Sequence, residues 1–260
     1  MELSVDLAML ETAMLAGVRL AAFFVVAPPF HMSSFPGRVK VALALGIAVA
    51  AVPRVDASSQ IVAGTLLADN AAVMIGTLVL QAFVGLALGF LVRLVFGAVQ
   101  AAGGLIDLFG GFQLAQGYDP ISGSQGSVFS RFYYMAALAL LFASDGHQLV
   151  ISGVVRSFDA VPLGAGVNLE SIASLMAGGL SELMVAAVQI AGPLLVVLFL
   201  ADVGLGLLTR VAPALNAFAL GFPLKILITL ALGSIAFLAL PQVIASLSGR
   251  AFTAMTVVTA

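Results

Sequence analysis

One short stretch, Ser144-Asp145-Gly146-His147, brings together a hydroxyl, a carboxylate and an imidazole, the three groups of a hydrolase triad. No Gly-x-Ser-x-Gly turn or other nucleophile context accompanies it, and an Asp-Gly pair is typical of a turn. The other histidine, His31, is far away in the chain, no His-Glu-x-x-His pair occurs, and cysteine is absent. We therefore expect a turn or helix end here, no metal or other cofactor, and no enzymatic activity.

Charged side chains within apolar segments are the second chemical signal. Arg93 is the main example, because a charge at membrane depth is costly and normally faces a partner or a water-filled cavity. Asp107 and Asp202 are the acids in comparably apolar surroundings, and Arg19 and Arg210 are the other bases. A structural ion pair is one interpretation, and a proton or ion relay is the alternative. An isolated pair lacks the chain of acids that a relay uses.

Small residues recur every fourth position around this arginine. The series is Gly85, Gly89, Arg93, Gly97 and Ala101. On a helix this spacing makes one nearly flat ridge, which lets another helix approach closely. The ridge predicts helix packing, either within the chain or against another subunit.

The stretch 110–130 differs in composition from everything around it. It holds five glycines, four serines, three glutamines and a single Asp-Pro. Its unpaired backbone groups could not face lipid, so it must lie in water, inside protein or along a polar cavity. Composition alone allows a linker, an ion-binding break or a gating loop.

The elements that carry these residues are predicted to be membrane helices. Of the 260 residues, 62% are hydrophobic and only 8% are charged, and the net charge of −2 includes no basic patch for nucleic acid. The apolar segments are 12–30, 39–53, 70–101, 131–153, 180–209 and 224–247. Their uneven lengths favour an all-α membrane protein of about six hydrophobic segments, built from tilted and broken helical hairpins with a central Gly-rich loop.

The loops between these segments indicate the orientation and the breaks. The bases Arg38, Lys40, Arg131, Arg210 and Lys225 all fall on one side, which predicts a cytoplasmic face there and the N-terminus outside. Pro28-Pro29 should stop or kink the first helix. Residues 154–179 are predicted to be an extramembrane excursion, with a turn over 157–164 and a weakly signalled short helix from Asn168 to Met176.

The stretch from Leu200 to Lys225 carries the densest pattern. Asp202, Gly206 and Arg210 share one helical face. Pro213 is expected to end that helix, and Asn216, Gly221 and Pro223 to shape a tight link to the next one, beside Lys225.

This pattern resembles the FliR family of export-gate subunits of type III secretion systems. The strongest match is Asp202-x-Gly204-x-Gly206-x-x-x-Arg210-x-x-Pro213-x-x-Asn216-x-Phe218-x-x-Gly221-Phe222-Pro223-x-Lys225. Supporting matches are Pro28-x-Phe30 with Arg38 and Lys40, Asp119-Pro120, Asp145-Gly146-His147, Ser157-Phe158 and Pro162-Leu163-Gly164. The chain departs from the family at Ala214 and at Leu108-Phe109, where the family has glutamine.

The resemblance implies a single export-gate membrane domain over residues 1–260 and a non-enzymatic role in the bacterial inner membrane, at the flagellar basal body. It implies homologues of FliP, FliQ, FlhB and FlhA as partners, and unfolded flagellar proteins as substrates. A homologous subunit of a virulence type III system is the alternative. A small-solute secondary transporter is a weaker one, because the two halves of the chain show no internal repeat.

The resemblance also implies that the stretch 110–130 is a pore plug. Phe109, Phe112 and Tyr118 are then the bulky stoppers, Gly110, Gly111 and Gly117 supply positive φ, and Asp119-Pro120 fixes where the loop ends.

Overall fold

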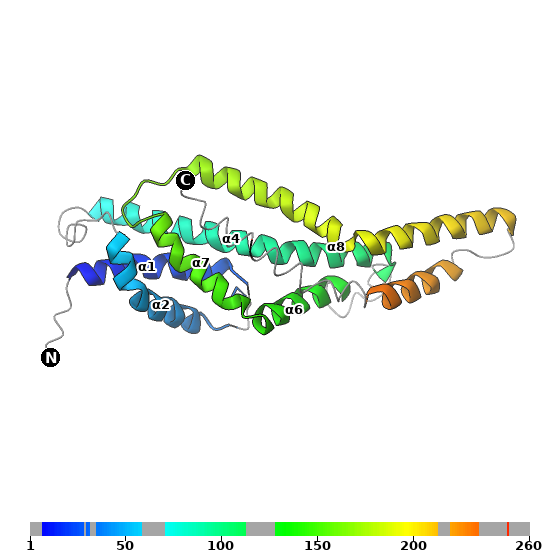
Figure 1. Cartoon of the computed structure of the whole chain (residues 1–260), viewed down its shortest axis with the longest axis horizontal. Helices are drawn as coiled ribbons and strands as arrows, with labels where there is room; N and C mark the ends of the chain where they lie inside the picture. The colour runs from blue at the N-terminus through cyan, green and yellow to red at the C-terminus, as the bar shows by residue number, and fades with distance from the viewer. Residues whose placement is uncertain are drawn as a thin grey trace. The chain divides into compact units, whose positions relative to one another are not determined.

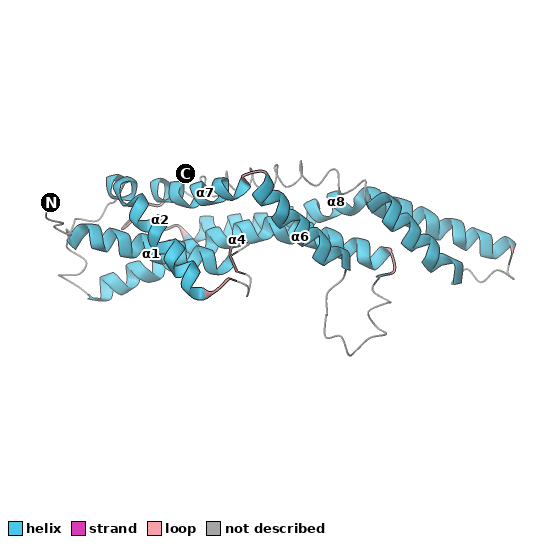
Figure 2. Ribbon diagram, turned by 90° about the horizontal axis from the view of Figure 1, so that it is seen from below, coloured by secondary structure: helices cyan, strands magenta, loops and turns pink. Residues whose placement is uncertain are grey.

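The structure is a computed structural model that describes residues 7–28, 30–31, 35–58, 71–112, 128–212, 219–233 and 249. Within these ranges every regular element is a helix (Figures 1 and 2). The helices are α1 (Leu7–Val26), α2 (Gly37–Ser58), α4 (Ala71–Phe109), α6 (Val128–Ala143), α7 (Gly146–Ala160) and α8 (Leu169–Val211), followed by Ala219–Gly233. The prediction of an all-α protein is confirmed.

Three of the described helices, α1, α4 and α8, are long and apolar enough to cross a membrane. The pair α6 and α7 would make a fourth span if the two are counted together. At 1.5 Å per residue the 39 residues of α4 are about 58 Å long, against about 30 Å for a hydrocarbon core. One apolar segment of the sequence is therefore not equivalent to one span, although the membrane class of the protein holds.

Several helix ends lie where the sequence predicts them. The first helix ends at Val26, just before Pro28, and α4 ends at Phe109, followed by Gly111 with a left-handed φ of 82°. The apolar segment 131–153 is broken at Asp145, a non-glycine residue with φ 55°. Aspartate tolerates this conformation better than most residues, which explains its place in the turn.

The local prediction for residues 154–179 is right that a turn precedes a helix that follows Asn168, but wrong in the bounds of both. Helix α7 continues to Ala160, and the expected short helix is the start of the 43-residue α8. The side chain of Asn168 caps this helix, because its Oδ1 accepts hydrogen bonds from the amides of Glu170 at 3.0 Å and Ser171 at 3.2 Å. No Glu is needed to complete this cap.

The chain forms two compact units. Unit 1 contains residues 1–94, 145–179 and 248–260, and unit 2 contains residues 95–144 and 180–247. The chain passes between the units within α4, within α8 and at the turn between α6 and α7. A single domain over residues 1–260 stays a prediction.

In unit 1, α1 lies along α4 in the same direction (Figure 1). Gly85 faces the backbone carbonyl of Arg19, and Gly89 faces that of Phe23, 2.9 Å from where a Cβ would stand. Residues with side chains would hold the two backbones apart at both points. The first two glycines of the ridge therefore define how closely α1 packs.

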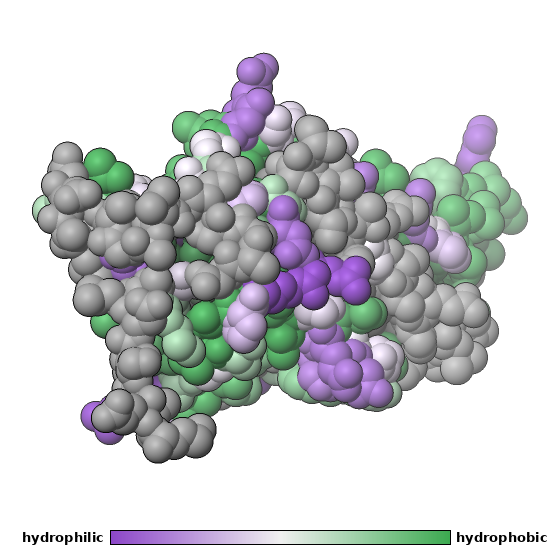
Figure 3. Space-filling model, turned by 60° about the vertical axis from the view of Figure 1, so that its left-hand side comes forward, coloured by the Kyte–Doolittle hydropathy of each residue, from purple (hydrophilic) through white to green (hydrophobic). Residues whose placement is uncertain are grey.

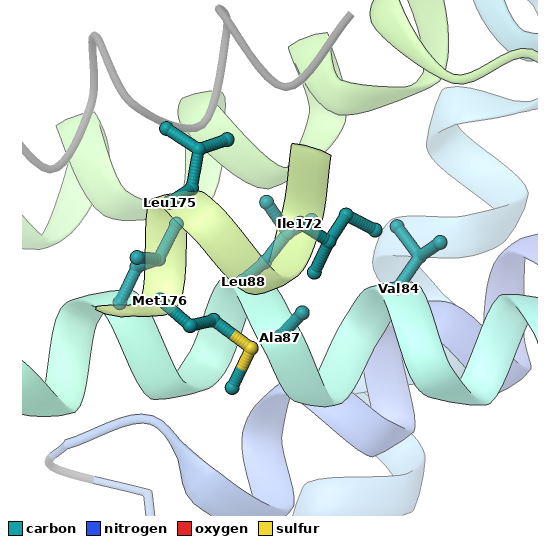
Figure 4. Close-up of a pocket in the computed structure, with 7 residues that line it drawn as sticks. Val84, Ala87, Leu88, Ile172, Leu175 and Met176 are labelled. Atoms are coloured by element: carbon teal, nitrogen blue, oxygen red, sulfur yellow. The ribbon is translucent and has the colours of Figure 1, made fainter. Parts of the chain in front are cut away.

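A small hollow lies between α4 and the first turns of α8 in unit 1 (Figure 4). It is lined by Val84, Ala87, Leu88, Leu91, Ile172, Leu175 and Met176. All seven side chains are apolar, so this hollow has no group that could bind an ion or a polar solute.

In unit 2, glycines farther along α4 lie in close contact with helices other than α1. Gly97 lies against Leu183 of α8, with 3.0 Å between the leucine Cδ1 and a Cβ built on the glycine. Gly103 lies against the backbone of Phe129, where a Cβ would come within 2.5 Å of the carbonyl oxygen. The ridge of small residues on α4 thus packs against different helices along its length.

Gly85→Ala tests the close approach of α1 to α4. The added methyl group would overlap the carbonyl of Arg19, so α1 must shift, and overpacking of this kind costs about 1–3 kcal/mol. We expect a lower midpoint of thermal unfolding for the detergent-solubilised protein. Gly76→Ala on the same helix is the control, because nothing lies within 4 Å of its added methyl group. Equal midpoints for the two variants would contradict the packing.

Candidate functional site: the base of the central loop and the buried charges

The structure describes the base of the predicted plug but not its middle. Helix α4 ends at Phe109, residues 110–112 follow it, and residues 128–130 form the first turn of α6, so the last three residues assigned to the loop are helical. Gly117, Tyr118, Asp119 and Pro120 lie outside the described residues. The end of α4 and the start of α6 flank this segment.

A buried carboxylate joins these two ends. Asp107 is fully buried near the end of α4, and its two oxygens accept hydrogen bonds from the amides of Phe129 at 3.0 Å and Ser130 at 2.9 Å. These amides lie in the first turn of α6, where the helix itself offers them no acceptor. A negative charge at this end also complements the helix dipole. Asp107 is therefore a cap supplied by a neighbouring helix.

Aromatic side chains complete the base. The rings of Phe112 and Phe129 meet edge to face with their centroids 5.1 Å apart, and Phe222 lies 3.1 Å from where a Cβ of Gly111 would stand. Phe112, a predicted stopper, is thus packed against α6, whereas the other described stopper, Phe109, is 40% exposed.

The prediction of positive φ holds for Gly111 and is wrong for Gly110. Gly110 is required for space instead. A Cβ there would lie 2.8 Å from both the carbonyl of Ile106 and the hydroxyl of Thr229. The two adjacent glycines therefore serve different purposes, one for backbone conformation and one for close packing.

The buried cation of unit 1 is Arg19. It is fully buried, and its guanidinium donates hydrogen bonds to Oε1 of Gln81 at 2.7 Å, to the carbonyl of Val161 at 2.8 Å, and to both the carbonyl and the hydroxyl oxygen of Ser157 at 3.0 and 3.2 Å. It also stands 4.1 Å from the ring centroid of Phe158. Two of these acceptors are carbonyls at the C-terminal end of α7, where a positive charge is favourable.

Arg93, by contrast, is exposed. Both acids considered as partners of Arg93 contact other groups in unit 2. Asp107 accepts a hydrogen bond from an amide in the first turn of α6, and Asp202 forms an ion pair with Lys225. The predicted ion pair of Arg93 therefore gains no support. Burial is the larger cause that lowers the pKa of His31, and Arg93 and Lys40 lower it further, so both cations lie near His31.

The residues of the family pattern meet across two helices of unit 2. Nζ of Lys225 lies 2.7 Å from Oδ1 of Asp202, and Gly221 lies against Leu205 of α8. Gly221 and Pro223 belong to the helix Ala219–Gly233, so the predicted tight link at these two residues is wrong. Pro213 and Asn216 lie outside the described residues, and α8 ends at Val211. Gly206 and Arg210 are on the exposed surface of α8.

The residues of the apparent triad serve local structure. The hydroxyl of Ser144 donates to the carbonyl of Leu140 at 2.7 Å, and Asp145 occupies the left-handed turn before α7. Farther along α7, Asp159 makes an exposed ion pair with Arg54 of α2, with Nη2 and Oδ2 2.6 Å apart. This hydrogen bond, and then the charge of Asp159, raise the pKa of Arg54.

The sequence alone did not identify the two uncharged side chains that accept hydrogen bonds from Arg19. Gln81 and Ser157 lie in different segments; Gln81 belongs to no recognised motif, and the family match Ser157-Phe158 gave no indication that Ser157 contacts Arg19. Gln81 is a buried polar residue one turn before Gly85, and that position beside a small-residue ridge was the available signal.

The architecture defines an all-α membrane protein whose polar contacts cap and join helices. The family described as "Bacterial export proteins, family 1" matches residues 10–251. Flagellar biosynthetic protein FliR of Bacillus subtilis is 31% identical over 219 residues, covering 83% of this chain and 82% of the relative. FliR of Escherichia coli is 33% identical over 216 residues, covering 83% and 80%.

A relative from a different system matches over a shorter range. Surface presentation of antigens protein SpaR of Shigella flexneri is 30% identical over 150 residues, which is 58% of each chain. From the match over residues 10–251 and the two FliR proteins, the chain belongs to the FliR family of bacterial export proteins.

Asp107→Ala tests the cap at the loop base. Losing a side-chain cap costs about 0.5–2 kcal/mol, so we expect the amides of Phe129 and Ser130 to exchange hydrogen about 2- to 30-fold faster. Hydrogen–deuterium exchange with mass spectrometry of the peptide that begins α6 measures this. Asp202→Ala also removes one acid of unit 2 and should leave these amides unchanged. Unchanged exchange in Asp107→Ala would refute the cap.

Proposed function

We propose that this chain is a non-enzymatic subunit of the flagellar type III protein export gate in the bacterial inner membrane, at the flagellar basal body. The observation that carries the proposal is the match to FliR proteins over more than four-fifths of this chain. The pairing of Asp202 with Lys225, at the two ends of the family pattern, supports it. As part of the gate, the chain helps to form the channel through which unfolded flagellar proteins leave the cytoplasm.

The exposed apolar surface supports a subunit that needs neighbours. Only 28% of α8 is buried within this chain, and its exposed side chains include Met184, Phe199, Leu200 and Leu207. Figure 3 shows, among the described residues of one face, hydrophilic residues next to patches of hydrophobic ones. Lipid or the apolar helices of other subunits would cover such a surface. We propose homologues of FliP, FliQ, FlhB and FlhA as these subunits.

Within that gate, the segment between Phe112 and Val128 acts as the plug. The proposal draws on its glycine-rich sequence and on the fixed base formed by Asp107, Phe112 and Phe129. A segment anchored at both ends can move aside for a substrate without displacing the helices that carry it. Phe109 and Tyr118 supply bulk to close the pore, and Asp119-Pro120 sets the extended geometry at one point of the segment.

The flagellar system is favoured over a virulence system by coverage. The FliR proteins of Bacillus subtilis and Escherichia coli match at least 80% of both chains, whereas SpaR matches 58%. The apolar lining of the hollow in unit 1 also does not favour small-solute transport.

Deleting the gene tests the flagellar role directly. Without this subunit the gate is incomplete, so the strain should not swim in soft agar or secrete flagellin into the medium. A plasmid copy of the gene should restore both. Normal swimming and flagellin secretion in the deletion strain would overturn the proposal. Isolation of the tagged protein should recover a large complex with FliP and FliQ homologues rather than a stable monomer.

Shortening the segment 113–127 tests the plug. With Asp107 and both helix ends intact, the complex should still assemble, but the membrane should leak small solutes, measured by swelling of spheroplasts in an osmotically matched solute. A Gly-Ser segment of the original length is the control that separates lost bulk from lost length. If the shortened variant stays tight and still exports flagellin, the segment is only a connector.

A further inference from the structure

Basic side chains, three of them cationic, gather where α1 ends in unit 1. His31 follows the last turn of α1, Arg38 and Lys40 lie in the first turn of α2, and Arg93 lies on α4. We call these four residues the cationic cluster. They come from three separate parts of the chain, so the fold and not the local sequence brings them together.

Helix packing accounts for this arrangement. The position of a Cβ on Gly89 lies 3.4 Å from the amide nitrogen of Ala27, and the amide of His31 donates to the carbonyl of Ala27 at 3.1 Å. Arg93 is one turn beyond Gly89 on α4. Arg93 therefore lies level with the chain just after α1, where the membrane-spanning stretch of that helix has ended.

The start of α2 is tied to the same place by aromatic rings. Phe24 packs edge to face on Phe30 with a centroid distance of 4.6 Å, and Phe30 packs on Phe35 at 5.8 Å. Phe35 directly precedes Pro36 and the first turn of α2, which contains Arg38 and Lys40.

Among the described residues no ion pair offsets the positive charge of Arg38, Lys40 and Arg93. After burial, Arg93 and Lys40 lower the pKa of His31, so both cations lie near that side chain. Arg54 engages Asp159, an acid of the same unit, at the other end of α2. Arg38, Lys40 and Arg93 therefore concentrate positive charge and hydrogen-bond donors in one place.

Apolar side chains are exposed directly beside these charges. Val25, at the end of α1, is 59% exposed, and Val39 and Val41, on either side of Lys40, are 42% and 52% exposed. A border of cations next to exposed aliphatic groups at the end of a membrane helix is complementary to the phosphate and the upper acyl chain of a phospholipid.

We propose that the cationic cluster is a binding site for the phosphate of an anionic phospholipid headgroup. Arg93 and Lys40 hold the phosphate, Arg38 adds positive charge at the rim, and Val25, Val39 and Val41 contact the acyl chain. A soluble phosphate ion would use the same cations but would leave these valines uncovered. The lipid site does not depend on the proposed export function, so either proposal can fail without the other.

The test measures phospholipid bound to the full chain, purified in detergent with the subunits that accompany it. Native phospholipid is removed by washing, phosphatidylglycerol or phosphatidylcholine is added back, and bound lipid is quantified by mass spectrometry. Each cation near an anionic lipid surface contributes about a five-fold gain in affinity. The double variant Lys40→Gln/Arg93→Gln should therefore bind phosphatidylglycerol about 25-fold more weakly, again on that rule.

Two further double variants control the measurement. Arg131→Gln/Arg210→Gln removes two exposed cations from unit 2 and should leave binding unchanged. Lys40→Arg/Arg93→Lys keeps both charges and should keep binding, which separates loss of charge from misfolding. If the Gln double variant retained as much phosphatidylglycerol as the wild type, the proposed site would be wrong. It would also be wrong if the wild type retained phosphatidylcholine as well as phosphatidylglycerol. Displacement of the lipid by millimolar inorganic phosphate would assign the cluster to a free anion instead and would also overturn it.

Discussion

The burial of one guanidinium constrains unit 1 more than any other single contact. Taking a charge out of water costs several kcal/mol unless its donors are satisfied, and Arg19 meets this demand with acceptors on α4 and α7 and with an aromatic face. Gln81 and Ser157 can reach it only if α1 lies close to α4, which the glycines at 85 and 89 permit. A loosely packed arrangement of the same helices would leave a buried charge without partners, so the packing is specific as well as apolar.

The helix pair α6 and α7 is also stabilised by buried charges, a negative one at the start of α6 and a positive one at the end of α7. The outer ends of this pair leave backbone groups that have no partner within their own helix. At the outer N-terminal end, the carboxylate of Asp107 accepts from the amides of α6, and at the outer C-terminal end the guanidinium of Arg19 donates to the carbonyls of α7. Each charge has the sign that the helix dipole favours.

Much of this fold could be predicted from the sequence, because it follows from local chemistry. Apolar composition predicted helices, Pro28 and Asp145-Gly146 marked real ends, and the pattern from Asp202 to Lys225 identified the family. The sequence did not show which of the arginines in apolar segments would be buried. Arg19 and Arg93 have similar apolar neighbours in sequence, and their difference in burial depends on how far α1 extends alongside α4. The continuity of α8 through Gly178 and Gly179 was likewise hidden, since paired glycines usually weaken a helix. Of the candidate site, the composition predicted a polar insert, but the cap at its base joins residues 22 and 23 positions apart and required the fold.

The direction of these caps along the chain has a consequence for biosynthesis. Asp107 precedes α6 and Arg19 precedes α7, so each capping side chain leaves the ribosome before the helix that it will cap. During synthesis the N-terminal part of the chain is available to fold first. The polar ends of the pair α6 and α7 can therefore be satisfied as they emerge, without waiting for the long C-terminal half of the protein. In this chain the order of translation and the order of helix capping coincide.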